Sequence, residues 1–199
     1  MVLEQSEMMA TVLAHEIKNP AALAMAYVGL LRHTAEPAEI DDYCNRIQQC
    51  LMDISELVQD LLFAAKNKPE PCNINVTGML EEMLEEYRAA YGCSFTLNAA
   101  ANLTCHVYEQ HLRLVFSNLL KNAVEAAGAA GRIAVCAAKQ DGYLCVEICN
   151  SPAAAVVKPY SNGMGLGICE WLLGQVGGGL EVQNGADECV VIVSIPVGG

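Results

Sequence analysis

The sequence predicts an α+β protein in which an antiparallel helical hairpin precedes an α/β sandwich. In the N-terminal third, apolar residues recur at helical spacing in two long segments joined by one short connection. Beyond the proline-containing segment "KNKPEPCN", runs with helical spacing mix with runs of strand-forming residues. We therefore expect a helical domain over residues 1–67, a linker over 68–73 and a sandwich domain over 74–199.

The first predicted helix runs from Val2 to Arg32 and contains a proline. Pro20 has no N–H group to donate to the carbonyl of Glu16, and its ring crowds the preceding turn. A kink or local opening beside His15 is therefore expected. A purely structural helix would gain nothing from a proline at this point.

The second predicted helix covers residues 37–66 and carries a heptad-like apolar stripe. Its members are Ile40, Tyr43, Ile47, Cys50, Ile54, Leu57 and Leu61. The connection "HTAEPAE" is short, so the two helices should pack antiparallel as a hairpin. Two helices leave apolar stripes uncovered, and a second copy would complete a four-helix bundle. A homodimer is therefore expected.

The rest of the chain predicts one layer of helices on one mixed sheet. The predicted helices cover 77–92, 109–127 and 166–177, and the predicted strands cover 94–99, 102–107, 132–140, 143–150, 179–184 and 189–197. Asp141-Gly142 and "GADE" mark two hairpin turns between successive strands.

Composition and charge exclude several classes of protein. The hydrophobic share of 53% is enough for a real core, and the formal charge of -12 disfavours nucleic acid and anionic membrane surfaces as partners. No apolar run has the length of a membrane span, and the N-terminus lacks the pattern of a secretory signal. The 10 cysteines include no CxxC pair, so we expect reduced thiols and a cytoplasmic location.

The first motif that suggests chemistry is "HEIKNP". His15 is a nucleophile at neutral pH, Glu16 is placed to accept or orient its proton, and Asn19 adds an amide one turn further on. The plain alternative is a surface helix that happens to contain a histidine. The motif alone does not choose between these readings.

The second motif is "SNLLKNAVEA". Asn118 and Asn122 are four residues apart, so their amides share one helical face, and amide oxygens suit a hard cation such as Mg²⁺. Asparagines are also common on helix surfaces. Lys121 lies between them in the sequence, and two orientations of its side chain stay open, toward phosphates or toward solvent.

The third motif is "SNGMGLGICEW", in which Gly163, Gly165 and Gly167 alternate just before a predicted helix. Such spacing lets the backbone approach phosphates closely, and the N–H groups at the start of the helix attract anions. The segment is neither a dinucleotide-binding fingerprint nor a P-loop. A tight turn without a ligand is the alternative.

In this order along the chain, the three motifs resemble those of the bacterial sensor histidine kinases. "HEIKNP" looks like the phosphoacceptor box, "SNLLKNAVEA" like the N box and "GMGLGIC" like the second glycine box. The hairpin and the sandwich also resemble that family's dimerisation and phosphotransfer domain and its ATP-binding domain of the GHKL type. The resemblance covers nearly the whole chain.

The resemblance implies a role for each motif. His15 would be the phosphoacceptor, Glu16 would activate it, and Asn19 would position the phosphoryl group or a hydrolytic water. Asn122 would be a Mg²⁺ ligand with Asn118 close to the metal and phosphates. The three glycines Gly163, Gly165 and Gly167 would form the hinge under the nucleotide phosphates.

One box departs from the family pattern. The family has Asp-x-Gly-x-Gly after the strand that follows the N box, and its aspartate accepts a hydrogen bond from the adenine amine. Here Asn150 stands at the aspartate position, and the following segment is "SPAAAVVKPYSN". The Asn150 carbonyl can still accept from adenine, but it is uncharged, so the bond is expected to be weaker. Lys158 is the one cation of this segment, facing either a phosphate or solvent.

The resemblance implies a kinase that binds ATP and Mg²⁺, phosphorylates its own histidine and passes the phosphoryl group to an aspartate of a response-regulator receiver domain. The resemblance also leaves room for a membrane sensor domain before this core in the full-length protein. Two alternatives stay open. One is a degenerate phosphotransferase or scaffold that no longer binds ATP, and the other is an ATPase of the chaperone or mismatch-repair type with the same sandwich.

Overall fold

The structure is a computed structural model that describes residues 2–66, 70–128, 130–151, 166–185 and 188–197. Within the first two helices, the side chains of residues 2–13, 15, 16, 56 and 60–66 lie outside this description. The chain divides into two compact units, Met1–Lys68 and Pro69–Gly199.

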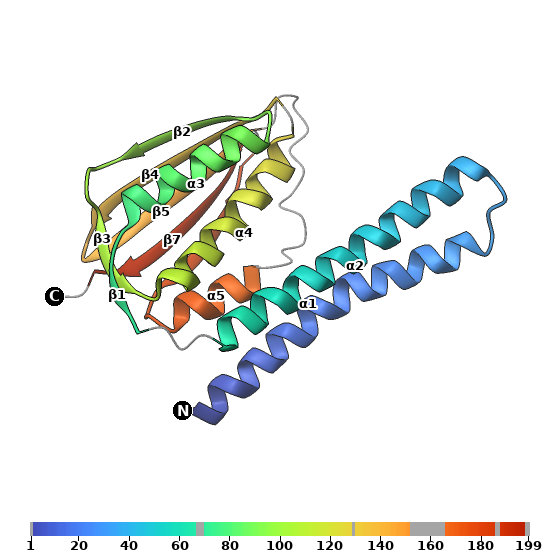
Figure 1. Cartoon of the computed structure of the whole chain (residues 1–199), viewed down its shortest axis with the longest axis horizontal. Coiled ribbons are helices and arrows are strands. Elements are labelled where there is room, and N and C mark those ends of the chain that lie inside the picture. Colours follow the sequence, from blue (N-terminus) through green and yellow to red (C-terminus); the bar gives the residue numbers. More distant parts are fainter. Residues whose placement is uncertain (1, 67–69, 129, 152–165, 186–187, 198–199) are drawn as a thin grey trace. The chain divides into compact units, whose positions relative to one another are not determined.

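The first unit is a hairpin of two long helices, α1 (Val2–Leu31) and α2 (Pro37–Lys66), which lie side by side (Figure 1). Helix α1 continues through Pro20, so the chain stays helical on both sides of this residue, and the kink or local opening expected beside His15 stays a prediction. The Pro20 side chain is buried. Burial of this apolar ring offsets part of the cost of the hydrogen bond that Pro20 cannot donate.

A cluster of polar and aromatic side chains links the two helices near the connection between them. The rings of Tyr27 in α1 and Tyr43 in α2 stack with centroids 6.0 Å apart. The Arg46 guanidinium lies 5.6 Å from the centroid of the Tyr27 ring and donates to the Tyr27 hydroxyl at 3.4 Å. Arg46 also pairs with Asp42 at 2.7 Å. These contacts fix the register of α1 against α2, with Ala24, Cys50 and Leu57 buried along the hairpin.

The second unit has three helices and seven strands among its described residues. In chain order these are β1 (Cys72–Asn75), α3 (Val76–Ala90), β2 (Ser94–Ala99), β3 (Thr104–Val107), α4 (Glu109–Ala127), β4 (Arg132–Gln140), β5 (Tyr143–Ser151), α5 (Leu166–Gly174), β6 (Gly179–Asn184) and β7 (Cys189–Pro196). Five strands form one sheet in the order β2-β4-β5-β7-β6, and β1 pairs with β3 in a separate antiparallel ribbon. Only the β2–β4 pairing of the large sheet is parallel.

Helices α3, α4 and α5 lie over one face of the large sheet (Figure 1). Strands β4, β5 and β7 alternate buried and less buried residues, because successive side chains point to opposite faces of a sheet. The buried set meets the apolar side of α4. The largest fully buried side chains include Phe116, Leu119, Leu120, Ile133, Leu144, Ile148 and Ile195.

Element ends differ from the predicted ones where local turn chemistry decides. Strand β1 begins at Cys72, inside the segment expected to be linker. Helix α3 begins at Val76, because the Asn75 side chain accepts a hydrogen bond from the Gly78 N–H at 3.2 Å and caps it. Helix α5 ends at Gly174, three residues before the predicted end, where a turn leads to Gly177 with φ +71°.

Candidate functional site

Helix α4 carries the second motif in its middle. Phe116, Leu119 and Leu120 are buried and fix this helix in the core, while Asn118 and Asn122 lie one turn apart. The Asn118 amide nitrogen donates to the Leu114 carbonyl at 3.2 Å, so its oxygen Oδ1 is the atom that remains for a ligand. Asn122 is 8% exposed, and its amide nitrogen Nδ2 has no hydrogen-bond partner.

Asn150 lies near the end of β5, on the side of the sheet that faces the helices. It shares this side with Leu144, Val146 and Ile148 and is 1% exposed. Its neighbours across the sheet are Ile133 in β4 and Cys189 in β7. The oxygen Oδ1 of Asn150 has no partner, although a buried polar atom without a hydrogen bond costs about 1–3 kcal/mol.

The two buried asparagines therefore belong to adjoining elements, because α4 packs against β5. One offers an amide nitrogen and the other an amide oxygen without a protein partner. Most buried polar atoms in folded proteins are hydrogen-bonded, and exceptions are often explained by a ligand. This pair of amides marks the α4 and β5 side of the second unit as a candidate binding site.

Lys121 is partly buried on α4 and affects a tyrosine of α3. Burial raises the pKa of the Tyr87 hydroxyl, the hydrogen bond with Ser117 opposes this shift, and the positive charge of Lys121 also lowers that pKa. The Tyr87 hydroxyl donates to the Ser117 carbonyl at 3.0 Å. The charge of Lys121 is thus felt at Tyr87, and the phosphate-binding role of Lys121 stays a prediction.

The third motif is described only at its end. Gly167 is the second residue of α5 and is partly buried. Gly163, Gly165 and Lys158 lie outside the described residues, so the phosphate-binding role predicted for them stays a prediction.

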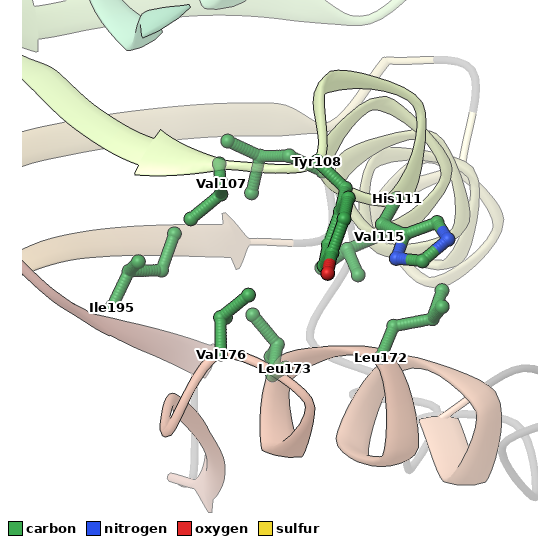
Figure 2. A pocket seen from close by; sticks show the side chains of 9 residues that line it. Val107, Tyr108, His111, Val115, Leu172, Leu173, Val176 and Ile195 are labelled. Atoms are coloured by element: carbon green, nitrogen blue, oxygen red, sulfur yellow. The ribbon is translucent and has the colours of Figure 1, made fainter. Parts of the chain in front are cut away.

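A small pocket opens between α4 and α5 (Figure 2). Apolar side chains line most of it, among them Leu172, Val176 and Ile195. His111 points toward the α5 side, and the centroid of its ring lies 5.0 Å from that of Tyr108. Both ring nitrogens of His111 are buried without a partner, and burial lowers its pKa. No pattern in the sequence predicted this environment of His111, because it depends on α5, which is distant along the chain.

The first motif lies on α1. Its backbone is helical at His15, Glu16 and Asn19. The Asn19 side chain is exposed, whereas the side chains of His15 and Glu16 lie outside the described residues. The accessibility that a phosphoacceptor requires stays a prediction for His15.

Residues 5–70 match the family model of the His Kinase A (phospho-acceptor) domain. The matched segment is therefore similar to a phospho-acceptor domain. It contains the whole "HEIKNP" motif. The curated relative Sporulation kinase D of Bacillus subtilis (strain 168) is 21% identical over 207 residues, which cover 92% of this chain. The chain spans 40% of the length of that relative.

Solved structures show the same fold. The histidine kinase ThkA, in its crystal structure with the response regulator protein TrrA, has a TM-score of 0.65 at 24% identity, over 96% of this chain and 61% of that chain. The Acinetobacter baumannii histidine kinase AdeS has a TM-score of 0.62 at 11% identity, and the match covers 93% of this chain and 98% of that chain. The nucleotide-free catalytic domain of ThkA covers 65% of this chain and 97% of its own, with a TM-score of 0.56 at 23% identity. The hairpin thus matches a phospho-acceptor domain, and the chain as a whole shares the fold of these histidine kinase structures.

The donor set of the second unit fits a purine nucleotide with a hard cation. Asn150 offers a buried acceptor suited to an exocyclic amine, and Asn118 offers an amide oxygen of the kind that Mg²⁺ accepts. Asn122 presents its nitrogen, which suits a phosphate oxygen; a half turn of the amide presents the oxygen to a cation instead. No cluster of three or more metal-ligating His, Cys, Asp or Glu side chains exists in the described part of the chain. None of the described helices is long and apolar enough to cross a membrane.

Proposed function

We propose that this core phosphorylates His15 with ATP and passes the phosphoryl group to an aspartate of a response regulator. The observation that carries this proposal is the match of residues 5–70 to a phospho-acceptor domain, with His15 inside the motif. The unpartnered amides of the sandwich support an ATP site in the same chain. The fold shared with histidine kinases is consistent with both.

The chemistry at His15 is an in-line displacement. A ring nitrogen attacks the γ-phosphorus of ATP, the bond to the β-γ bridging oxygen breaks, and ADP leaves with the electron pair. Glu16 takes or orients the imidazole proton, and Asn19 holds the phosphoryl group or a hydrolytic water. In the second step, an aspartate carboxylate of the receiver domain attacks the phosphohistidine and the histidine is regenerated.

The nucleotide would be held by residues of α4, β5 and α5 together with residues of the segment 152–165. Asn150 accepts from the base, Asn118 and Asn122 lie at the phosphates and the cation, and Gly167 belongs to the glycine hinge. Gly163, Gly165, Lys121 and Lys158 complete the proposed set. A bound Mg²⁺ would neutralise charge on the phosphates. Such a reaction places the core in the cytoplasm, where ATP is available.

A homodimer of the His Kinase A domain follows from a second apolar stripe on the hairpin. Leu23 and Leu30 lie seven residues apart on α1 and are 49% and 47% exposed. Leu51 and Val58 have the same spacing on α2 and are 58% and 39% exposed. Heptad spacing of exposed apolar residues is typical of helices that pack against further helices. A second copy of the hairpin would cover this stripe and complete a four-helix bundle.

The proposed partner is a receiver domain, because the similar kinase ThkA is solved in complex with a response regulator protein. The His Kinase A match supports the same choice, since such a domain holds a phosphoryl group that needs an acceptor.

The test is incubation with γ-labelled ATP and Mg²⁺, followed by acid treatment of the protein. Wild type should acquire acid-labile label, and H15Q should acquire none. His33 follows the end of α1 and is exposed, so H33Q should retain the label and controls for the loss of a histidine. Label that survives acid, or label retained in H15Q, would contradict the proposal.

Two further results identify the alternatives. An unlabelled protein that binds no ATP but accepts a phosphoryl group on His15 from a phosphorylated receiver would be the degenerate phosphotransferase. ATP hydrolysis that persists in H15Q without any labelled protein would indicate an ATPase.

A further inference from the structure

Tyr87 links α3 to the turn of α4 at which the second motif begins. Its hydroxyl donates to the Ser117 carbonyl at 3.0 Å and lies 3.4 Å from the Ser117 hydroxyl oxygen Oγ. Two aromatic neighbours hold the Tyr87 ring, Tyr91 with the centroids 5.5 Å apart and Phe95 with the centroids 6.3 Å apart. A packed ring on α3 therefore holds the hydroxyl against the backbone of α4.

The bonded carbonyl belongs to the residue directly before Asn118. Residues four apart share a face of an α-helix, so Ser117 lies in one row with Lys121. Burial raises the pKa of the Tyr87 hydroxyl and the charge of Lys121 lowers it, so Lys121 lies within electrostatic reach of Tyr87. Asn118 and Asn122 form the adjacent row. The Tyr87 hydroxyl thus bonds to α4 beside the row of amides that supports the ATP site.

We propose that Tyr87 is a positioning residue for the Mg²⁺ complex of ATP, because its hydroxyl fixes the rotation of α4 on which the places of Asn118 and Asn122 depend. This inference rests on the proposed function, since it takes these two amides to lie at the cation and the phosphates. An amide at the surface of a helix lies about 5 Å from the axis, so a rotation of about 10° moves it by about 0.9 Å. In catalysis, a misplacement of about 1 Å can cost a factor of about a hundred.

The apolar contacts of α4 define this rotation less sharply than the hydrogen bond does. Phe116, Leu119 and Leu120 hold the helix in the core, but the hydrophobic effect has no preferred direction. A hydrogen bond is directional, and the one from Tyr87 ties α4 to α3. Loss of the hydroxyl should therefore shift the two amides without releasing the helix from the core.

Mg²⁺ makes the strictest demand on the position of the amides. It requires near-ideal octahedral geometry with ligands at about 2.0–2.1 Å. Apolar contacts with a nucleotide tolerate small shifts, because they are not directional. Removal of the Tyr87 hydroxyl should therefore weaken the Mg²⁺-dependent part of the nucleotide affinity more than the part that remains without the metal.

The variant Y87F removes the hydroxyl and leaves the ring. The Ser117 carbonyl lies inside α4 and keeps its helical partner four residues on, so it does not become a buried acceptor without a hydrogen bond. The phenyl ring keeps its neighbours Tyr91 and Phe95. We therefore expect Y87F to fold, with a Tm close to that of wild type.

The experiment is isothermal titration of the full chain with ATP, once in Mg²⁺ and once in EDTA. For Y87F, the ratio of the Kd in EDTA to the Kd in Mg²⁺ should be about threefold to tenfold smaller than for wild type. A general loss of stability would not change this ratio, because it acts under both conditions alike. Tyr91 is 42% exposed beside Tyr87, so Y91F is the matched control and should keep the wild-type ratio.

The outcomes separate the inference from the function on which it rests. If folded Y87F keeps the wild-type ratio, or if Y91F lowers the ratio equally, the inference fails and the ATP site remains. A Y87F protein that does not fold would also overturn the inference, because the hydroxyl would then be needed for the fold itself. If wild type binds no ATP in Mg²⁺, the proposed ATP site fails and the inference fails with it.

Discussion

At the scale of single residues, His111 makes the second unit sensitive to acid. Its imidazole is buried between α4 and α5 with both nitrogens unpartnered, and burial lowers its pKa from 6.5. The unfolded chain therefore binds a proton at this residue at a higher pH than the folded chain does. The contribution of neutral His111 to the free energy of unfolding is therefore fully present above pH 6.5. It is lost as the pH falls through the lowered pKa of His111 in the folded state.

We expect the urea midpoint of wild type to fall between about pH 7.5 and about pH 5.5 more steeply than that of H111F. Phenylalanine keeps an aromatic ring in the pocket but cannot take up a proton. His106 lies on the exposed side of β3, and H106F is the matched control for replacing a histidine by phenylalanine. Equal slopes for wild type and H111F would show that His111 does not contribute to the acid sensitivity.

Residue types were predictable from the sequence, whereas their environments were not. The spacing of Asn118 and Asn122 predicted amides one turn apart on α4, which the structure contains. The unpartnered nitrogen of Asn122 and oxygen of Asn150 depend on packing between α4, β5 and β7. A single sequence contains no direct record of such long-range packing, and for the same reason the pocket around His111 was not expected.

At the scale of elements, the hairpin between β4 and β5 depends on a backbone conformation that favours glycine. Asp141 and Gly142 have φ values of +52° and +83°. Positive φ at both central residues is the geometry of a type I′ turn, which the Asp-Gly pair predicted.

We expect G142A to destabilise the second unit by about 1 kcal/mol, because alanine pays a steric cost at positive φ. G174A is the matched control. Gly174 ends α5 without a positive φ, and a Cβ there would meet nothing within 4 Å. Thermal unfolding of both variants should show a lower Tm for G142A and no loss for G174A. An equal loss in both would contradict the role of the turn.

Long elements with a clear period were predicted well, and short ones were not. The limits of α2, α4 and β4 agree with those expected from the apolar spacing and the turn residues. Strand β1 was missed, because four residues are too few to show an alternation. The kink or local opening expected beside His15 stays a prediction, since the structure shows only that α1 continues through Pro20 and that the Pro20 ring is buried.

At the scale of the whole molecule, the exposed stripe of the hairpin predicts self-association through the first unit. Replacing Leu51 by glutamate should place a charge in the proposed interface between copies and weaken the dimer by about tenfold or more. Met25 is 75% exposed and lies off the heptad positions of Leu23 and Leu30. M25E should therefore leave the dimer intact.

Sedimentation equilibrium of wild type, L51E and M25E measures the monomer–dimer constant directly. If wild type is monomeric, or if L51E and M25E weaken the dimer equally, the exposed stripe is not the interface between copies.

The position of β5 has a further consequence for ligand capture. This strand is bonded on both sides, so the backbone at Asn150 is held at Ile133 and at Cys189 at once. Folding has already met the entropy cost of fixing this part of the chain. In the proposed function, a base bound at Asn150 would meet a preorganised contact, and the free energy gained there would go into affinity rather than into ordering the strand.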